Sequence, residues 1–480
     1  FSDFSEKKLL KDKEVKRITF NEITSSAIKQ AINSPREIDQ DLVDAYLARR
    51  ILDHLIGFKV SPLVWRHAPP AKSAGRVQSP SLRIICERET ERDKHIKEEY
   101  WPISSKFVFK DFIFDAELIK RNEEDLKKNP ISSEIGVREI ESVLKSSEFF
   151  IKSIETKPQS SSPNPPFRTS TLQMTASSFL GFTADRTMRA AQNLYEAGLI
   201  TYLRTDGINI STSPNTGEPF SEENPGPPPL QEIRNVIVEK FGDKFLSDQV
   251  RVYKSKVKNS QEAHEAIRPT NIKTYPDNIN LGQDEQKLYT LIWNRTVSSQ
   301  MSNSQHERKK IVVCSKDQKY VFNASSRKTL FDGFETLSKK DSSEIVEFPE
   351  NLKENENVSL AEFISEQKFT SPPNRYSEAS LIKKMEELGI GRPSTYASTV
   401  KGLRDKKYAY GAKSIAPSDL GRVLNSYLSG VYKEFFIETK FTAELETELD
   451  KIAEGSISWT DVLDKFWEEL QNYLSKKIDG

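Results

Sequence analysis

The order in which helical and strand-like segments follow one another is the strongest constraint on how this chain of 480 residues can fold. Residues 97–161 alternate aromatic and polar side chains, as in "KFVFKDFIFDAELI", which is typical of half-buried strands. Strand-like patterns return over residues 306–369, whereas residues 162–305 and both flanking regions carry the apolar spacing of helices. If the two strand-rich stretches pair, the helices between them form an insertion, and the flanking helices can join into one body. Such nesting favours a ring or clamp over domains arranged in a row.

We therefore predict a mixed α and β, multidomain fold: a mainly helical toroidal clamp with a β-rich hinge or arch domain. Several domains are expected on length alone, because 480 residues exceed what one hydrophobic core usually contains. The predicted parts are the end of an α/β unit (1–40), a helical body (41–96 and 370–480), a β-rich arch (97–161 and 306–369) and a helical gate (162–305).

Charge is balanced overall but unevenly distributed. The chain has 71 Lys and Arg against 71 Asp and Glu, which argues against a simple polyanion binder. Residues 45–83, however, hold seven basic side chains and one acidic one, and residues 371–413 hold nine and four. These two stretches suggest a local groove for a polyanion, although ordinary exposed helix faces would give the same pattern.

Other compositional features limit the class of protein. No stretch approaches the roughly 20 apolar residues of a membrane-spanning helix, and the start "FSDFSEKKLLKDKEV" lacks a signal-peptide core. Cys86 and Cys314 are the two cysteines, too few for a disulfide framework or a zinc ribbon. We expect a soluble protein without zinc in a reducing, cytoplasmic setting.

The stretch "LYEAGLITYLRTDGINIS" contains the first candidate for chemistry, Tyr202. If a strand runs through residues 200–204, Tyr202 and Arg204 project to the same face. Arg204 could then hold a phosphate in front of the tyrosine oxygen and stabilise charge on a phosphoryl transition state. The alternative is a tyrosine packed by its ring, with Arg204 paired to Asp206.

Two further motifs carry candidate anion-binding groups. In "QEAHEAIRPT", His264 and Arg268 are four residues apart, so a helix would present both to one anion, although His264 paired to Glu265 is the alternative. In "KSAGRVQSPSLR", a glycine turn opens a helix, where backbone N–H groups can approach a phosphate beside Arg76 and Gln78.

The helix predicted over residues 40–58 places cations and a ring on adjoining faces. Arg49, Arg50 and Phe58 fit the combination of charge and stacking surface that single-stranded nucleic acid requires. The alternative is that Phe58 packs in the core and that Arg49 or Arg50 forms a salt bridge with Asp53.

Residues 372–408 predict two helices joined by a glycine-containing turn. Ser377 and Glu378 start the first helix, "GIGRPSTYAS" forms the turn into the second, and Arg392, Lys406 and Lys407 would be exposed. This pattern is similar to a winged-helix-like nucleic-acid module.

Together, "ITYLRTD", "QEAHEAIRP", "SAGRVQS" and "RYSEASLIKKMEELGIGRPSTYAS" resemble the bacterial type IA DNA topoisomerases, in that family's order and over nearly the whole chain. "FNEIT" and "LVDAYLARRILDHLIGFKVSPLVW" precede them, and "FTAELETELDKIAEG" follows. The resemblance implies that Tyr202 attacks a backbone phosphate of single-stranded DNA, forming a 5′-phosphotyrosine and releasing a 3′-hydroxyl. Arg204 would position the scissile phosphate, and His264 would lie in the same active site.

The resemblance also implies a substrate and a binding groove. Passage of the second strand before religation would relax negatively supercoiled DNA without ATP, and the enzyme would act as a monomer at the nucleoid on single-stranded or underwound DNA. The implied DNA-binding residues are Arg49, Arg50, Asp53, Phe58, Trp65, Ser73, Ala74, Gly75, Arg76, Val77, Gln78, Arg268, Arg392 and Lys406.

Departures from the family pattern qualify this expectation. The acidic toprim residues that bind Mg²⁺ in the full-length family enzymes are not in this chain, residues 1–40 resemble only the end of that domain, and no cysteine follows Cys314. We therefore expect no metal ligands here, and a fragment that binds single-stranded DNA but relaxes supercoils poorly. His54, Phe58 and Gly207 stand where Arg, Tyr and Ser are common. A topoisomerase III-like decatenase and a non-catalytic single-strand-binding clamp are the alternatives.

Overall fold

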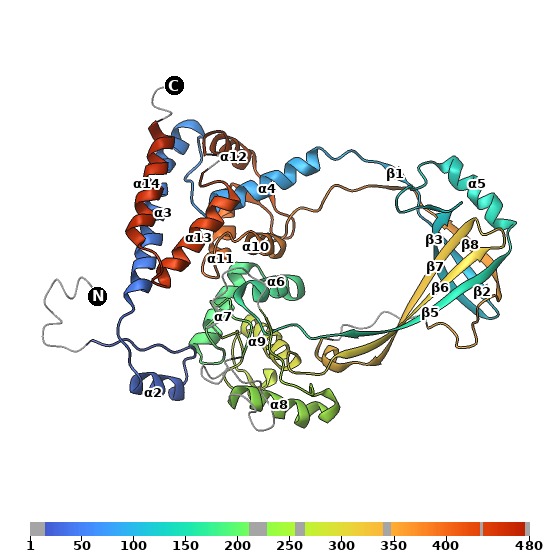
Figure 1. The fold of residues 1–480 in the computed structure, drawn as a ribbon, viewed down its shortest axis with the longest axis horizontal. Coiled ribbons are helices and arrows are strands. Elements are labelled where there is room, and N and C mark those ends of the chain that lie inside the picture. The colour runs from blue at the N-terminus through green and yellow to red at the C-terminus, as the bar shows by residue number, and fades with distance from the viewer. Residues whose placement is uncertain (1–14, 211–227, 255–264, 339–346, 433–434, 476–480) are drawn as a thin grey trace.

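A computed structural model describes residues 15–210, 228–254, 265–338, 347–432 and 435–475. Its helices and strands form three groups that follow one another around a ring (Figure 1). A helical body lies at one end and a β-barrel at the other, and a second group of helices lies beside the body. The mixed, multidomain architecture predicted from the sequence is confirmed.

The helical body is built from two distant parts of the chain. The long helix α3 starts where the Asp39 side chain accepts a hydrogen bond from the Leu42 N–H (3.1 Å). Its buried stripe includes Ala48, Leu52 and Ile56, at helical spacing, and packs against α13 and α14. The elements of the body are α3 (Gln40–His67), α4 (Gln78–Asp93), α10 (Glu378–Glu387), α11 (Tyr396–Asp405), β10 (Ala409–Tyr410), β11 (Ala416–Pro417), α12 (Asp419–Tyr432), α13 (Thr439–Ala453) and α14 (Trp459–Ser475).

The barrel forms because six antiparallel strands close on themselves. The strand order is β2-β8-β5-β6-β7-β3-β4, and β2 also pairs with β3. Phe107 is fully buried inside and contacts the rings of Phe114, Phe149 and Phe322. The elements here are β1 (Glu99–Tyr100), β2 (Ile103–Phe109), β3 (Phe112–Arg121), β4 (Glu124–Asp125), α5 (Glu134–Lys145), β5 (Phe149–Ser161), β6 (Ser304–Ser315), β7 (Tyr320–Phe331), the 3₁₀ helix η3 (Gly333–Leu337), β8 (Asn357–Ser365) and β9 (Lys368–Phe369).

The helices between β5 and β6 are an insertion in the barrel. These two strands pair from Phe149↔Ser315 to Ser161↔Ser304, which confirms the predicted pairing of the two strand-rich stretches. The insertion has its own core, including Leu194, Ile237 and Trp293. Its elements are α6 (Thr169–Leu180), α7 (Ala184–Glu196), α8 (Pro228–Phe241), η1 (Asp243–Phe245), η2 (Pro276–Asn278) and α9 (Gln283–Ser298).

Two local predictions were wrong. No strand runs through residues 200–204, where only an isolated bridge between Ile200 and Pro269 occurs. Residues 265–270 are extended and not helical, because their backbone groups bond to other segments: the Ile267 N–H donates to the Phe167 carbonyl (2.7 Å), and the Arg268 carbonyl accepts from Thr201 (2.9 Å).

In the segment before the body, the residues from 15 onward include the helix α2 (Ser25–Asn33), with Thr24 as its N-cap. This segment reaches the insertion, since the Tyr202 N–H donates to the Asn21 carbonyl at 2.7 Å. It thereby lies against the loop that carries the candidate nucleophile.

Candidate functional site

The loop that carries Tyr202 leaves α7 through a tight turn. Helix α7 ends at Glu196, and Gly198 adopts a left-handed conformation, with φ of +71°. A Cβ at this position would lie 2.6 Å from the Ile23 carbonyl oxygen, so the close approach of the N-terminal segment requires glycine.

Alternate residues of this loop are buried. Thr201, Leu203 and Thr205 have exposed fractions of 1%, 1% and 4%, whereas Tyr202 is 42% exposed and Arg204 is also exposed. Side-chain bonds hold the buried positions, including the Thr201 hydroxyl to the Ala266 carbonyl at 2.8 Å and the Thr169 hydroxyl to the Leu203 carbonyl at 2.7 Å. Tyr202 and Arg204 are thus both kept at the surface, although the loop is not a strand.

Arg204 lines a pocket between the insertion and the body. The pocket, of about 410 Å³, is bounded by α7, the Tyr202 loop, and α11 with the turn before it. Its lining includes the cations Arg189, Arg204 and Lys401 and the carboxylates Asp185 and Asp405. Asp185 lies 3.4 Å from both Arg189 and Lys401. The pocket can therefore accept an anion next to Arg204.

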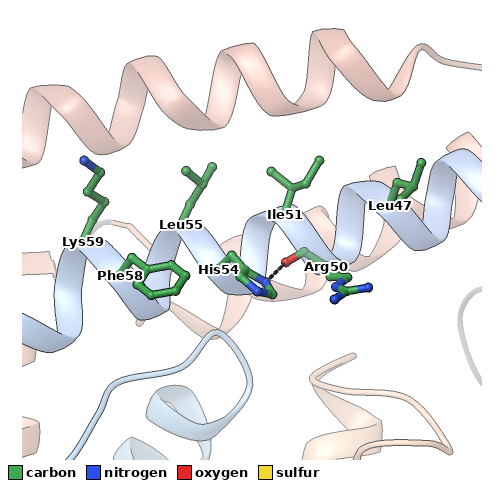
Figure 2. A pocket seen from close by; sticks show the side chains of 7 residues that line it. All are labelled: Leu47, Arg50, Ile51, His54, Leu55, Phe58 and Lys59. Atoms are coloured by element: carbon green, nitrogen blue, oxygen red, sulfur yellow. Dashed lines mark hydrogen bonds between the residues drawn. The ribbon is translucent and has the colours of Figure 1, made fainter. Parts of the chain in front are cut away.

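A second pocket, of about 520 Å³, lies along one side of α3 (Figure 2). Phe58 is 72% exposed there, and its ring lies 5.6 Å from that of His54, whose Nδ1 is 2.8 Å from the Arg50 carbonyl. Trp65 lies further along α3 and is 57% exposed, with its Nε1 donating to the Lys72 carbonyl. The alternative prediction, that Phe58 packs in the core, is therefore wrong. The ring is available for stacking on a base.

Sequence reasoning missed four residues of this pocket. They lie on α3 at the helical spacing of Arg50, His54 and Phe58, and this spacing is the signal that could have found them. The four residues are Leu47, Ile51, Leu55 and Lys59.

The glycine turn opens a helix as predicted, since α4 begins at Gln78. The Tyr408 hydroxyl holds this turn by accepting from the Lys72 and Ser73 N–H groups, both at 2.8 Å. Lys406 was predicted to be exposed but is partly buried, because its amine donates to the Ser73 hydroxyl (2.7 Å) and the Gln78 side chain (2.6 Å). Burial and the neighbouring charge of Lys72 lower the pKa of Lys406.

Other residues of this turn are also enclosed. Gly75 is partly buried, with its N–H donating to the Ser79 hydroxyl at 3.1 Å, and Ala74 and Val77 are 6% and 9% exposed. Few side chains of this turn are therefore accessible to a ligand.

Several predicted DNA-binding arginines are paired with carboxylates. Arg76 is 2% exposed, and its Nε lies 3.1 Å from Asp53. Arg268 is 5% exposed and contacts Glu265 and Glu22. Arg392, predicted to be exposed, has only 22% of its side chain accessible because it pairs with Asp450 at 2.6 Å. Their roles in DNA binding remain predictions.

His264 lies outside the described residues, so its place relative to Tyr202 also remains a prediction. Within the described ranges, no group of three or more His, Cys, Asp and Glu side chains is arranged to hold a metal ion. The Mg²⁺ expected for the family is accordingly not assigned to any of these residues. Among the helices that the structure describes, none has the length and apolar character needed to cross a membrane.

A family model described as DNA topoisomerase matches residues 37–464. This chain belongs to the bacterial type IA DNA topoisomerase family. It is 45% identical over 477 residues to DNA topoisomerase 1 of Rickettsia bellii (strain RML369-C), covering 96% of this chain and 58% of that protein. It is 40% identical over 475 residues to DNA topoisomerase 1 of Zymomonas mobilis, covering 97% of this chain and 38% of that protein.

The fold agrees with this assignment. The structure of full-length topoisomerase I from Thermotoga maritima superposes with a TM-score of 0.80 at 36% identity, covering 95% of this chain and 72% of that one. The chain spans about three fifths of the length of the Rickettsia topoisomerases that it matches.

In this topoisomerase chain, the insertion contacts the body mainly through charged groups. Arg168, before α6, forms two bonds with Glu386 of α10, at 2.9 and 2.6 Å, and the Ser170 hydroxyl donates to the same carboxylate. Glu378 accepts from the Ala184 N–H at the start of α7 (2.6 Å). Among the described residues, Ala184 is also the only insertion residue grouped with the body core. Hydrogen bonds and ion pairs therefore contribute to holding this contact closed.

Replacing Glu386 with Gln should loosen this contact of the topoisomerase chain. The change removes the charge from a pair whose side chains are 16% and 10% exposed, and we expect a loss of about 1–3 kcal/mol of opening free energy. Exchange of the Ala184 amide hydrogen should then accelerate by about 5- to 150-fold, as measured by hydrogen–deuterium exchange. The matched control is Asp284→Asn, which breaks the bidentate Arg186–Asp284 pair within the insertion. Equal acceleration in both variants would contradict a specific role of Glu386.

Proposed function

We propose that this chain carries the strand-cleaving and religating centre of a type IA DNA topoisomerase, with Tyr202 as the nucleophile. The observation that supports this most strongly is the loop geometry: buried neighbours hold Tyr202 and Arg204 at the surface, and Arg204 lines a pocket in which three cations face two carboxylates.

The chemistry follows from these two side chains. The Tyr202 hydroxyl gives up its proton, and its oxygen forms a bond to a backbone phosphorus while the bond from phosphorus to the 3′ oxygen breaks. The released 3′ oxygen takes up a proton and becomes the 3′-hydroxyl. Arg204 orients the phosphate and stabilises its transition-state charge. Religation reverses these steps, and because the phosphodiester energy is kept in the protein link, it needs no ATP. His264 would complete the same centre.

The partner in this proposal is single-stranded or underwound DNA, bound by a monomer. The exposed ring of Phe58 and the cations Arg50 and Lys59 along α3 offer stacking and phosphate contacts together. Passing the complementary strand through the gap before religation would relax negatively supercoiled DNA. A DNA substrate would place the protein at the nucleoid, in the cytoplasm.

End-labelled single strands test the proposal directly. A DNA oligonucleotide labelled at its 3′ or 5′ end is incubated with the chain, with and without added Mg²⁺, and stopped with detergent. A 5′-phosphotyrosine link should carry only the 3′ label into the protein band of a denaturing gel. A protein that binds the strand but forms no adduct with either label would be a non-catalytic clamp, and the cleavage proposal would be wrong.

A further inference from the structure

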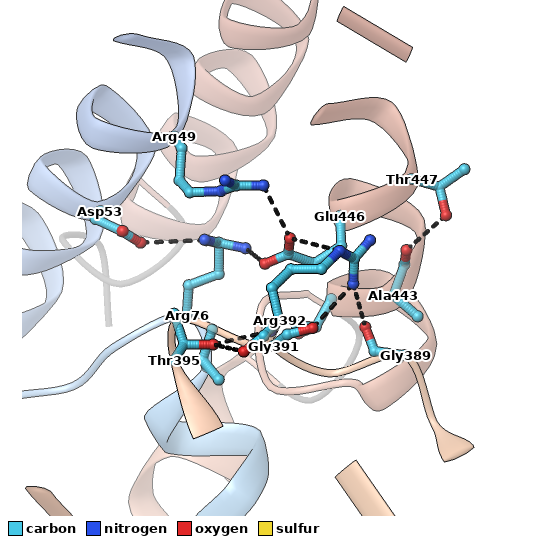
Figure 3. Close-up of polar contacts among 12 residues, drawn as sticks. Arg49, Asp53, Arg76, Gly389, Gly391, Arg392, Thr395, Ala443, Glu446 and Thr447 are labelled. Carbon is cyan, nitrogen blue, oxygen red and sulfur yellow. Dashed lines mark hydrogen bonds and ion pairs between the residues drawn. The ribbon is translucent and has the colours of Figure 1, made fainter. Parts of the chain in front are cut away.

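One buried carboxylate in the body faces three arginines (Figure 3). Glu446, on α13, is 1% exposed. Its oxygens contact Arg76 Nη1, Arg49 Nη2 at 3.4 Å and Arg392 Nε at 3.8 Å. The arginines come from the turn before α4, from α3 and from the turn between α10 and α11. Glu446 therefore connects three segments that lie far apart in the sequence.

The charges of this cluster balance. Arg76 also contacts Asp53 at 3.1 Å, and Arg392 contacts Asp450 at 2.6 Å, so three guanidinium groups face three carboxylates. Burial raises the pKa of Glu446, but the nearby arginines lower it further, and the net direction is down. Glu446 is thus a stable anion, and removing its charge leaves buried cations without a counterion.

The members of the cluster differ in their access to solvent. The side chain of Arg76 is 2% exposed and that of Arg392 is 22% exposed, whereas that of Arg49 is 35% exposed. Arg49 is also adjacent in sequence to Arg50, which lines the α3 pocket beside Phe58. The cluster therefore contains two enclosed arginines and one that can reach a ligand on the surface of α3.

We propose that Glu446 is a positioning residue for nucleic-acid binding: it holds the guanidinium of Arg49 in the orientation in which it contacts a backbone phosphate. Arg76 and Arg392 anchor Glu446 from the enclosed side. The inference rests on the proposed function, because it requires that a strand lies along α3.

The physical reason is the entropy of a long side chain. An untethered arginine loses rotamer freedom when it binds a phosphate, and this loss of entropy opposes the contact. Among the described contacts, only Nη2 of Arg49 reaches Glu446, and a guanidinium has five N–H donors, so a phosphate can be bound while the tether is kept. Glu446 thus lowers the ordering cost before the strand arrives, and without Glu446 this cost cancels the gain from the phosphate contact, which is then not made.

The same body offers a matched control. Glu89, on α4, is 4% exposed and also faces three arginines: Arg375 at 2.5 and 2.8 Å, and Arg92 and Arg422 at 3.8 Å. None of these arginines belongs to α3 or to the implied DNA-binding set. A change at Glu89 therefore perturbs a buried ion cluster of similar make-up without touching Arg49.

The test measures binding of a fluorescent oligothymidylate across a salt series. Each phosphate contact on a single strand contributes about 0.7 to the slope of log affinity against log salt concentration. We expect Arg49→Gln to reduce the slope by about 0.7, and Glu446→Gln to reduce it by a similar amount. In the Arg49→Gln background, Glu446→Gln should change the slope no further, whereas Glu89→Gln should leave the slope of the parent chain unchanged.

A second variant keeps the test decisive if Glu446→Gln does not fold. Glu446→Asp retains the charge but withdraws the carboxylate by one methylene, which breaks the long Arg49 contact before the short Arg76 contact. Folding of each variant is checked by circular dichroism melts, with Glu89→Asp as its partner. The same reduced slope in Glu446→Asp supports the inference.

The outcomes separate the two proposals. An unchanged slope in the Glu446 variants, or additive effects of Arg49 and Glu446, would overturn the positioning role while leaving strand binding intact. If Arg49→Gln itself has no effect on the slope, the positioning role is also overturned. A parent chain that binds no single strand would instead contradict the proposed function.

Discussion

Replacing Tyr202 with Phe is expected to lower covalent adduct formation by at least about 10³-fold, because phenylalanine has no oxygen to attack the phosphate. Affinity for single-stranded DNA should stay within about twofold, since the ring and its edge-on contact with Tyr195, at 5.4 Å, are kept. The measurement is the denaturing gel with a 3′-labelled strand, paired with equilibrium binding of the same strand.

The neighbouring tyrosine supplies the control for this prediction. Tyr195 lies on α7 and loses its hydroxyl in Tyr195→Phe, while its ring contact with Tyr202 is preserved. Burial and the nearby Tyr202 raise the pKa of Tyr195, which makes it a poorer source of phenolate than an ordinary tyrosine. Tyr195→Phe should therefore retain cleavage. An adduct that survives in Tyr202→Phe would show that another group is the nucleophile.

Replacing Arg204 with Gln is expected to slow cleavage by about 10²–10³-fold at saturating DNA, which corresponds to about 2.7–4 kcal/mol of transition-state stabilisation. The guanidinium is exposed, so its removal should leave the fold intact. The single-turnover rate of adduct formation reports this effect. A loss confined to affinity, with an unchanged rate, would show that Arg204 binds the strand without acting on the transition state.

The control is another arginine of the same pocket. Arg189 lines the pocket from α7, has a side chain that is 73% exposed and lies 3.4 Å from Asp185. Because this pair is solvent-accessible, Arg189→Gln should change the cleavage rate by no more than a few fold. Equal losses in the two variants would mean that the general charge of the pocket matters more than the position of Arg204.

Local patterns in the sequence were sufficient to predict most of the helices and strands. The apolar spacing of residues 40–58 predicted α3, and the alternation over residues 97–161 predicted strands that pair with those of residues 306–369. The predictions failed over residues 200–204 and 265–270. These two segments lie next to each other but do not form a regular β-ladder. Their conformation depends on hydrogen bonds to residues that are distant in the sequence, such as Phe167. A helical spacing of His264 and Arg268 carries no information about such partners.

The sequence likewise predicted some features of the candidate site and not others. The spacing of Arg50, His54 and Phe58 predicted one face of α3, and the pocket of Figure 2 lies along it. The expectation that Arg392 and Lys406 are exposed was wrong, because each is enclosed by groups contributed from other elements. Such burial cannot be predicted from the residues that neighbour an arginine or lysine in the sequence.

By itself, the sequence determined most of the helices and strands, their order along the chain, and the positions of Tyr202 and Arg204 two residues apart. These features follow from periodicity and spacing over a few residues. Only the tertiary structure decided which cations are available to a ligand. The partner of Arg76, Glu446, lies 370 residues away, and the burial of that pair is a property of packed helices that no local pattern contains.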